Sequence, residues 1–328
     1  MTPSLVTVFG GSGFLGRHLV QRLAATGARV TVAVRNPESA LFLKPMGDVG
    51  QITPVGADVR DGPAVVAAVQ GADWVVNLVG VLYETRRQSF GAIHAQGAER
   101  IAKAAKAAGA KRLVHVSAIG ADRHSSAAYA RSKAVGEAAV AAAYPAATIL
   151  RPSIIFGPED DFFNRFAAMA RLSMALPLFG GGETRFQPVY VGDVADAVMR
   201  SLTAEGTAGT TYELGVPRVY SFRQLMELIL AEIGRKRILL PLPFVVADAM
   251  GSVADALVGV LQYLPLPFEV APPLTGDQAK LLRYDNVVSG DAPGLADRGI
   301  TPTACEIILP TYLDRFRRHG RFEASPGG

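Results

Sequence analysis

The sequence has 328 residues, of which 49% are hydrophobic and 19% are charged, and its formal net charge is +4. This composition predicts a large folded core and excludes global disorder, and the weak positive charge does not indicate nucleic-acid binding. A single cysteine, Cys305, excludes an internal disulfide framework and fits a reducing compartment. The histidines are scattered, so we expect no metal site. The first strand begins close to the N-terminus and no uncharged stretch is long, so we expect neither a signal peptide nor a transmembrane helix.

The chain opens with a short apolar strand that runs directly into glycines. Residues 6–9 form the strand, and a helix is predicted at residues 17–25. Between them, Gly10 allows a tight turn, Gly13 lets the backbone approach a diphosphate, and Gly16 lets the helix lie close to the strand. The helix N-terminus adds free N–H groups and a partial positive charge. We therefore predict a dinucleotide-binding turn made of Gly10, Ser12, Gly13, Phe14, Leu15 and Gly16.

Through the first half of the chain, apolar β-branched runs alternate with alanine-rich helical segments. Strands that are buried on both faces and joined by crossover helices are typical of an α/β protein with a doubly wound parallel sheet, the Rossmann architecture. Further strands are predicted at residues 30–34, 52–55, 73–80, 112–117 and 147–152, and further helices at residues 62–69, 96–108 and 129–143.

After Pro152 the pattern changes, because loops rich in glycine and proline separate shorter helices. We predict a Rossmann domain that binds NADP(H) over residues 1–155, to which a later segment at about 185–202 returns. Residues 156–328 are predicted to form a smaller, mostly helical C-terminal lobe that faces a partner or a membrane.

One helix of this lobe, predicted at residues 244–264, carries a broad apolar surface. Two interpretations are open. Its apolar side chains fill the core of the lobe, which is the commoner arrangement, or they face a partner protein or the lipid interface.

The residues after the second strand indicate which dinucleotide is bound. An NAD-binding turn places a carboxylate there, but this strand is followed by Arg35, whose guanidinium can pair with a 2′-phosphate. We therefore predict NADPH or NADP+, with NADH less favoured; the alternative is that Arg35 is only a solvated charge. We expect Asp58 to accept a hydrogen bond from the adenine amino group, Val59 to line the ring, and Leu78, Val79 and Gly80 to pass the adenosine ribose.

Ser117, Tyr129 and Lys133 are the candidate catalytic residues. A Tyr and a Lys four residues apart project from one face of a helix. There the ammonium would lower the phenol pKa and also donate to the nicotinamide ribose. A serine hydroxyl at the end of the preceding strand can hold a substrate oxygen. The three residues together predict proton transfer beside a hydride that moves to or from the nicotinamide.

With these motifs, the sequence from Val6 to about Leu202 resembles the extended and atypical short-chain dehydrogenase/reductase superfamily. By this resemblance, residues 151–157, including Pro152 and Ile155, pack on the nicotinamide. Within the superfamily, the chain is similar nearly end to end to the NADPH-binding accessory subunit of respiratory complex I and its bacterial relatives. The segments that carry this similarity are residues 43–51, 77–80, 83–85, 187–194, 240–244 and 293–300.

The resemblance implies a tightly held NADPH that serves as structure, in a subunit docked beside the quinone-binding region of NADH:quinone oxidoreductase. It also implies a peripheral location, at the cytoplasmic face of a bacterial inner membrane or on the matrix side of the mitochondrial one, with possible contact with the membrane surface. His94 stands where many active members carry Asn, which argues against the usual proton relay, whereas Ser117, Tyr129 and Lys133 are intact.

Three functional hypotheses follow, and the sequence favours the first. In the first, the chain is an NADPH-binding accessory or assembly subunit of complex I, with its nucleotide mainly structural. Alternatively, it is an active NADP(H)-dependent reductase, epimerase or dehydratase that uses Ser117, Tyr129 and Lys133. A third and weaker interpretation is a redox-sensing regulator whose bound NADPH shifts a partner-binding surface.

Overall fold

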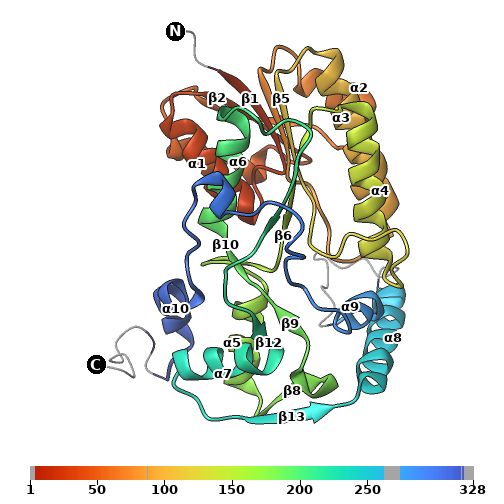
Figure 1. Ribbon diagram of the computed structural model, residues 1–328, viewed down its shortest axis with the longest axis vertical. Helices are drawn as coiled ribbons and strands as arrows, with labels where there is room; N and C mark the ends of the chain where they lie inside the picture. The colour runs from red at the N-terminus through yellow and green to blue at the C-terminus, as the bar shows by residue number, and fades with distance from the viewer. Residues whose placement is uncertain (1–3, 87, 262–273, 319, 321–328) are drawn as a thin grey trace. The chain divides into compact units, whose positions relative to one another are not determined.

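Figure 1 shows the computed structural model of the chain, which describes residues 4–86, 88–261, 274–318 and 320. The internal contacts of the chain divide it into two units. The first unit comprises the chain up to Pro152 together with Val191–Leu214 and Ser289–Thr301, and the second comprises Ser153–Tyr190, Gly215–Val288 and the chain from Pro302 onward. The return at Val191–Leu214 overlaps the predicted one, whereas no pattern in the sequence predicts the return at Ser289–Thr301.

The first unit is built on a seven-stranded parallel sheet. Its spatial order is β11-β6-β5-β4-β1-β2-β3, so β1 lies between β4 and β2 and the strand order reverses there. In such sheets, ligands bind beyond the carboxyl ends of the strands at this reversal. The strands are β1 (Leu5–Phe9), β2 (Arg29–Val34), β3 (Ile52–Gly56), β4 (Trp74–Asn77), β5 (Arg112–Val116), β6 (Thr148–Pro152) and β11 (Thr211–Leu214).

Helices cover both faces of this sheet, with α1 and α6 on one side and α2, α3 and α4 on the other (Figure 1). The predicted doubly wound α/β fold is therefore confirmed. The helical segments of this unit are α1 (Phe14–Ala25), η1 (Glu38–Met46), α2 (Gly62–Ala68), η2 (Gly91–Gly97), α3 (Ala98–Ala107), α4 (Ala128–Ala143), α6 (Val191–Thr203) and η4 (Ala296–Arg298).

Several boundaries differ from those predicted, each for a local reason. Helix α1 begins at Phe14, inside the glycine turn. Strand β4 ends at Asn77, because the Val79 N–H donates to the Asn77 side chain instead of continuing the strand. The helix before β5 begins with the π-helical segment η2, which starts at Gly91 and runs directly into α3.

Strand β11 was not predicted. It has only four residues, and a buried glutamate, Glu213, interrupts its apolar pattern. The Glu213 carboxylate accepts from the Ser289 N–H at 2.6 Å and lies 3.5 Å from the Arg151 guanidinium. Burial of Glu213 therefore depends on partners far away in the sequence.

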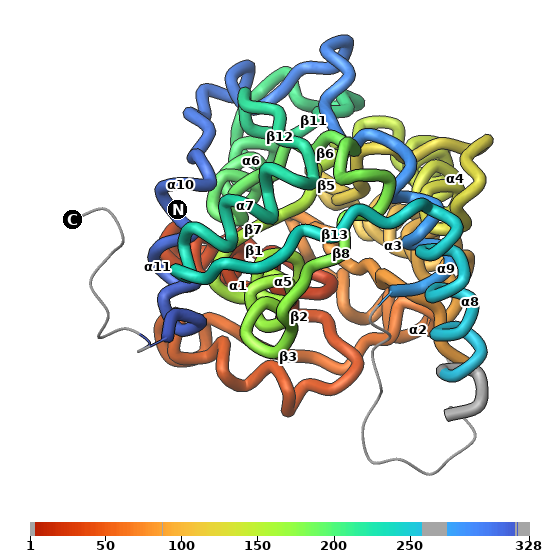
Figure 2. Tube along the Cα trace, turned by 90° about the horizontal axis from the view of Figure 1, so that it is seen from below, coloured from red at the N-terminus to blue at the C-terminus, as the bar shows by residue number. Residues whose placement is uncertain are grey.

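The second unit is mostly helical, and its strands form three two-stranded sheets in the part that the structure describes: β10-β7, β12-β9 and β13-β8. Figure 2 shows β8 and β13 side by side. Its strands are β7 (Ile155–Phe156), β8 (Ala175–Phe179), β9 (Arg185–Phe186), β10 (Val189–Tyr190), β12 (Tyr220–Ser221) and β13 (Ile238–Leu242). Its helical segments are α5 (Phe162–Leu172), η3 (Gly180–Gly182), α7 (Phe222–Glu232), α8 (Phe244–Leu261), α9 (Gly276–Leu281), α10 (Cys305–Ile308), α11 (Pro310–Leu313) and η5 (Asp314–Phe316).

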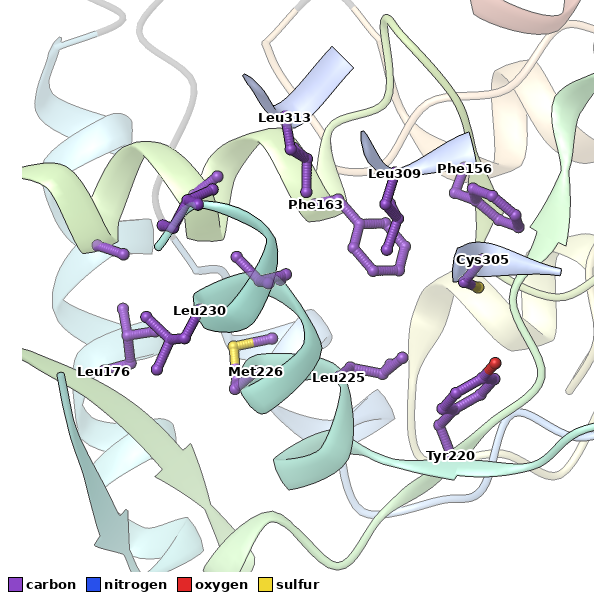
Figure 3. Close-up of a cluster of buried hydrophobic side chains, with 14 of the residues drawn as sticks. Phe156, Phe163, Leu176, Tyr220, Leu225, Met226, Leu230, Cys305, Leu309 and Leu313 are labelled. Atoms are coloured by element: carbon purple, nitrogen blue, oxygen red, sulfur yellow. The ribbon is translucent and has the colours of Figure 1, made fainter. Parts of the chain in front are cut away.

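A buried cluster of apolar side chains holds the second unit together (Figure 3). It includes Phe156, Phe163 and Leu309, which come from β7, α5 and the start of α11. Beside it, the buried Asp160 carboxylate accepts from the Phe163 and Asn164 N–H groups at the start of α5 and from the Tyr312 hydroxyl of α11. Apolar packing and this satisfied carboxylate together tie α11 to α5.

Helix α8 exposes an apolar face. Val245 is 73% exposed, Val253 68% and Leu257 56%, whereas Ala247 is fully buried. In the isolated chain these side chains therefore do not fill the core of the second unit. The helix was predicted to extend to residue 264, but residues 262–264 and the side chains of 258–261 lie outside the described part. Across the described residues, no helix combines the length and apolar character needed to cross a bilayer.

Candidate nucleotide-binding site

The glycine turn between β1 and α1 has the geometry of a diphosphate cradle. Gly10 has a φ of 77°, and its N–H donates to the Ala33 carbonyl at 3.1 Å. A Cβ on Gly16 would lie 2.4 Å from the Gly10 carbonyl oxygen and 2.5 Å from that of Gly11. Backbone atoms cannot give way cheaply, so only glycine lets α1 lie this close to the turn.

The first turn of α1 is open to an anion. Gly13 is its N-cap, no side chain caps the helix, and its first turn carries no acidic residue. The first N–H groups of a helix have no partner within the helix, and they carry the positive end of its dipole. A helix start that has no side-chain cap and lies at the strand-order reversal fits a dinucleotide diphosphate.

The loop after β4 lies against this turn. A Cβ on Gly10 would lie 3.3 Å from the Leu78 carbonyl carbon and the Val79 nitrogen. Leu78 and Val79 therefore adjoin the cradle, and the contact of Leu78, Val79 and Gly80 with the adenosine ribose stays a prediction.

The adenosine end of the predicted site contains Arg35 and Asp58. Arg35 follows β2 and is exposed. The Asp58 carboxylate is held by Arg60, whose Nε lies 2.9 Å from Oδ1, and this bond is the main reason that the pKa of Asp58 is lowered; the charge of Arg35 also contributes. The Asp58 oxygens expected to meet adenine are therefore already engaged by a neighbour in the same turn. Val59 is buried, and a Cβ on Gly97 would approach its Cγ2 to 2.9 Å.

Tyr129 and Lys133 lie on α4 beside the end of β5. The Lys133 Nζ is 5.8 Å from the centre of the Tyr129 ring and 3.5 Å from the Val116 carbonyl oxygen, next to Ser117. A Cβ on Gly80 would lie 3.3 Å from the same Nζ. The Ser117 hydroxyl belongs to a residue that is 4% exposed, and it has no hydrogen-bond partner among the described residues. A buried hydroxyl without a partner in the protein is suited to form a hydrogen bond with a ligand.

The pKa values of this pair are set by burial. Burial raises the pKa of Tyr129 to about 12, opposite to the lowering expected from Lys133, because the ring lies against Phe90 and His94 and phenolate would be poorly solvated there. Burial also lowers the pKa of Lys133 to about 8, and the negative charge of Glu137 opposes this shift. Tyr129 is therefore a neutral hydrogen-bonding group at neutral pH.

An ion pair that the sequence did not reveal fixes α4 against the sheet. The Arg151 Nε on β6 donates to one oxygen of Glu137 at 2.9 Å, and a terminal nitrogen donates to the other at 2.6 Å. Such a two-bond fork sets direction as well as distance. Because Glu137 lies one turn beyond Lys133, the fork also sets the position of the Tyr129–Lys133 turn.

The expected nicotinamide segment divides between the units. Pro152 ends β6, and its carbonyl accepts from the Ile119 N–H at 3.0 Å. Ile155 belongs to β7 of the second unit, so its contact with a cofactor stays a prediction. No group of three or more His, Cys, Asp or Glu residues able to hold a metal ion occurs among the described residues.

A glycine turn at the reversal point of a doubly wound parallel sheet, followed by a Tyr-x-x-x-Lys pair on α4, defines a Rossmann-fold protein of the short-chain dehydrogenase/reductase class. The model of the NAD dependent epimerase/dehydratase family matches residues 6–215, and the chain belongs to this family. A nicotinamide dinucleotide is thereby supported as the class of cofactor.

Known relatives extend the match over nearly the whole chain. It is 39% identical over 320 residues to the mitochondrial NADH dehydrogenase [ubiquinone] 1 alpha subcomplex subunit 9 of Arabidopsis thaliana, covering 96% of this chain and 79% of the relative. It is 31% identical over 320 residues to the mitochondrial NADH-ubiquinone oxidoreductase 40 kDa subunit of Neurospora crassa, covering 98% and 81%. The kinship with complex I subunits inferred from the sequence motifs is confirmed.

Solved structures share the fold. The dTDP-glucose 4,6-dehydratase DesIV of Streptomyces venezuelae, determined with NAD and TYD bound, matches with a TM-score of 0.70 and 20% identity, over 97% of this chain and 98% of that one. At this level of identity, the likeness concerns the fold alone.

Proposed function

We propose that this chain is an accessory subunit of a respiratory NADH:quinone oxidoreductase, in which a bound nicotinamide dinucleotide serves mainly as structure. The observation that carries the proposal is the similarity of nearly the whole chain to two mitochondrial subunits of such complexes, at 39% and 31% identity. A ligand that binds only the folded chain stabilises it without any turnover. The glycine cradle and the uncapped start of α1 supply what such a ligand needs.

The residues of the first unit have distinct binding roles. The N–H groups at the start of α1 would hold the diphosphate, and Lys133 would donate to the nicotinamide ribose. Tyr129 would remain protonated and donate a hydrogen bond, because burial holds its pKa at about 12. The chemistry that NADPH would supply in this site is hydride transfer to an acceptor. A structural role therefore requires that acceptors stay out.

NADPH is the proposed form of the cofactor. Arg35 supplies a positive charge beyond β2, and the nearby Asp58 carboxylate is already neutralised by Arg60, so it would not repel a 2′-phosphate strongly. A guanidinium can pair with that phosphate through two parallel hydrogen bonds.

The second unit is proposed to contact the rest of the complex near its quinone-binding region, and through it the membrane surface. The exposed apolar face of α8, with Val245, Val253 and Leu257, supports this proposal. Exposed apolar patches mark surfaces that a partner or a lipid interface covers. The corresponding location is the cytoplasmic face of a bacterial inner membrane or the matrix side of a mitochondrial one.

The test is to follow the full chain in its native membranes. A tagged copy is expressed at its natural level, the membranes are solubilised in mild detergent, and the complexes are separated by native electrophoresis. We expect the chain to migrate with the NADH:quinone oxidoreductase, as identified by mass spectrometry of the separated complexes, and we expect alkaline extraction to release NADPH in stoichiometric amount. Consistent absence from an otherwise intact complex would contradict the proposal.

An active NADP(H)-dependent reductase is the second candidate, because the buried Ser117 hydroxyl lacks a partner among the described residues and Ser117 follows Val116, whose carbonyl oxygen lies 3.5 Å from the Lys133 Nζ. NADPH oxidation is measured with a panel of aldehydes and ketones, for the wild type and for Tyr129→Phe. Turnover that disappears in Tyr129→Phe while NADPH binding persists would favour this candidate. A wild type that is inactive on the whole panel would remove it.

A further inference from the structure

His94 lies in an unusual place in the first unit. It belongs to the π-helical segment η2, is 2% exposed, and stacks on Phe90 with ring centres 5.4 Å apart. The His94 and Tyr129 rings are nearly perpendicular, with centres also 5.4 Å apart. π-helical turns are rare and occur frequently at functional sites.

Both ring nitrogens of His94 are used. The Val81 N–H donates to Nε2 at 3.0 Å, so Nε2 accepts, and the neutral ring carries its proton on Nδ1. Nδ1 lies 2.8 Å from the Ser132 Oγ, and the Ser132 hydroxyl donates to the Tyr129 carbonyl at 2.7 Å. His94 and Ser132 therefore each donate one bond and accept one. These bonds connect the loop after β4 to the turn of α4 that carries Tyr129.

A second set of bonds holds the same loop. The Val79 N–H donates to the Asn77 Oδ1 at 3.0 Å, and the Asn77 Nδ2 lies 3.1 Å from the His115 Nδ1. The amides on either side of Gly80 are thus both fixed by buried side chains. A Cβ on Gly80 would lie 3.7 Å from the His94 Nε2 and 3.3 Å from the Lys133 Nζ. Gly80 is therefore the point where loop, histidine and lysine meet.

The position of His94 is tightly constrained. A Cβ on Gly136 of α4 would lie 2.1 Å from the His94 carbonyl oxygen, so η2 and α4 are in direct backbone contact. Burial, and to a lesser degree the neighbouring Lys133 and His115, lowers the pKa of His94 to about 2. A ring that stays neutral, with both nitrogens hydrogen-bonded, takes up no second proton at neutral pH; it holds its neighbours in place.

We propose that His94 is a positioning residue that fixes the spacing between the loop Leu78–Val81 and the Tyr129–Lys133 turn, and thereby shapes the nicotinamide half of the site. The inference rests on the proposed function, since it requires a nicotinamide dinucleotide in this site. It goes further by assigning a role to His94, which holds Val81, at the end of the loop beside Gly80 and Lys133. Val79, which adjoins the glycine cradle, is held by Asn77 instead, so the loss of the His94 bonds should leave the cradle unchanged.

The experiment compares two ligands on the full chain. In His94→Phe, the ring volume and the stack on Phe90 are kept, but both hydrogen bonds are lost. Calorimetry measures binding of NADPH and of 2′,5′-ADP, which lacks the nicotinamide half. We expect NADPH to bind about tenfold more weakly and 2′,5′-ADP to stay within about twofold of wild type, because only the nicotinamide side loses its alignment.

Three further variants separate positioning from general stability. His94→Gln keeps one acceptor and one donor at the end of the side chain and should bind NADPH within about threefold of wild type. Ser132→Ala removes the next hydrogen bond of the same series, the one between Ser132 and His94. The double variant His94→Phe with Ser132→Ala should bind NADPH no more weakly than His94→Phe alone. The matched control is His124→Phe. His124 is exposed in the same unit, so this variant should bind NADPH and 2′,5′-ADP as the wild type does.

The outcomes are distinct. Selective loss of NADPH affinity in His94→Phe, with recovery in His94→Gln, supports the inference. Equal weakening of both ligands, or unchanged NADPH binding in both His94→Phe and Ser132→Ala, overturns it while leaving the proposed function intact. If the wild type binds neither ligand, the proposed function fails and the inference fails with it. Should His94→Phe not fold, Ser132→Ala decides the same question.

Discussion

Arg35 is the residue on which the choice between the two dinucleotides depends. Replacing it by Asp places a negative charge where a 2′-phosphate would lie. We expect Arg35→Asp to weaken NADPH binding at least about tenfold and NADH binding by less than about twofold. Titration of each cofactor by nicotinamide fluorescence measures both effects. Equal effects on NADPH and NADH would contradict the assignment, and Arg29→Asp, an exposed charge at the other end of β2, is the matched control.

Lys133 gives stability a defined dependence on pH. Burial lowers its pKa from 10.5 to about 8, so between these values the unfolded chain binds a proton that the folded chain releases. The free energy of unfolding attributable to this residue therefore rises with pH across that window. We expect the wild type to gain stability relative to Lys133→Met between about pH 8 and pH 10, by a few kcal/mol at most. Urea denaturation at several pH values across this range measures the free energy of unfolding of both proteins. If the two free energies change with pH in parallel, Lys133 titrates normally.

At the residue scale, the sequence predicts the parts of the site that are local. The glycine turn and the Tyr129–Lys133 pair each lie within a few positions, so spacing alone places them on one turn or one helix face. The bonds of His94 join it to Val81 and Ser132, 13 and 38 positions away. No local pattern predicts such a network, and only the departure from Asn drew attention to the residue.

At the scale of elements, β1 to β6 and the helices α1, α2, α3 and α4 could be predicted because each has a strong period and a clear stop, whereas η1 was not predicted. The segment η2 could not, since Gly91 and Gly97 are unfavourable in helices and a π-helical register depends on packing. Here Gly97 packs against Val59 and the His94 carbonyl against Gly136. Tertiary contact decides this element, as it decides the short strand β11.

The contact between α5 and α11 makes a prediction of its own. In Tyr312→Phe the buried Asp160 carboxylate loses the hydroxyl that donates to it but keeps the backbone N–H groups of Phe163 and Asn164. We expect the second unit to lose about 1–3 kcal/mol of stability. Chemical denaturation of Tyr312→Phe and of the wild type measures the loss. Equal stability of Tyr312→Phe and the wild type would show that the hydroxyl contributes nothing.

At the scale of the whole molecule, the exposed face of α8 allows assembly to be tested separately from folding. Val253 and Leu257 are more than half exposed, so replacing both by Ser should change the melting temperature of the isolated chain by less than about 2 °C. Recovery of the chain with the respiratory complex should fall severalfold, because the apolar contact is lost. Val66→Ser, an exposed valine on α2, is the control. Undiminished recovery would show that α8 contacts neither partner nor membrane.

The discontinuity of the first unit has a consequence for how the protein is made. Its sheet needs β11 from Val191–Leu214, and the Glu213 N–H of that strand donates to the Pro293 carbonyl in Ser289–Thr301. The nascent chain on the ribosome therefore cannot finish its nucleotide-binding half until almost everything has been translated. Shortened versions that stop after Pro152 would leave β6 as an open sheet edge, prone to aggregation. Biochemical work on cofactor binding thus requires a polypeptide that extends at least through Thr301.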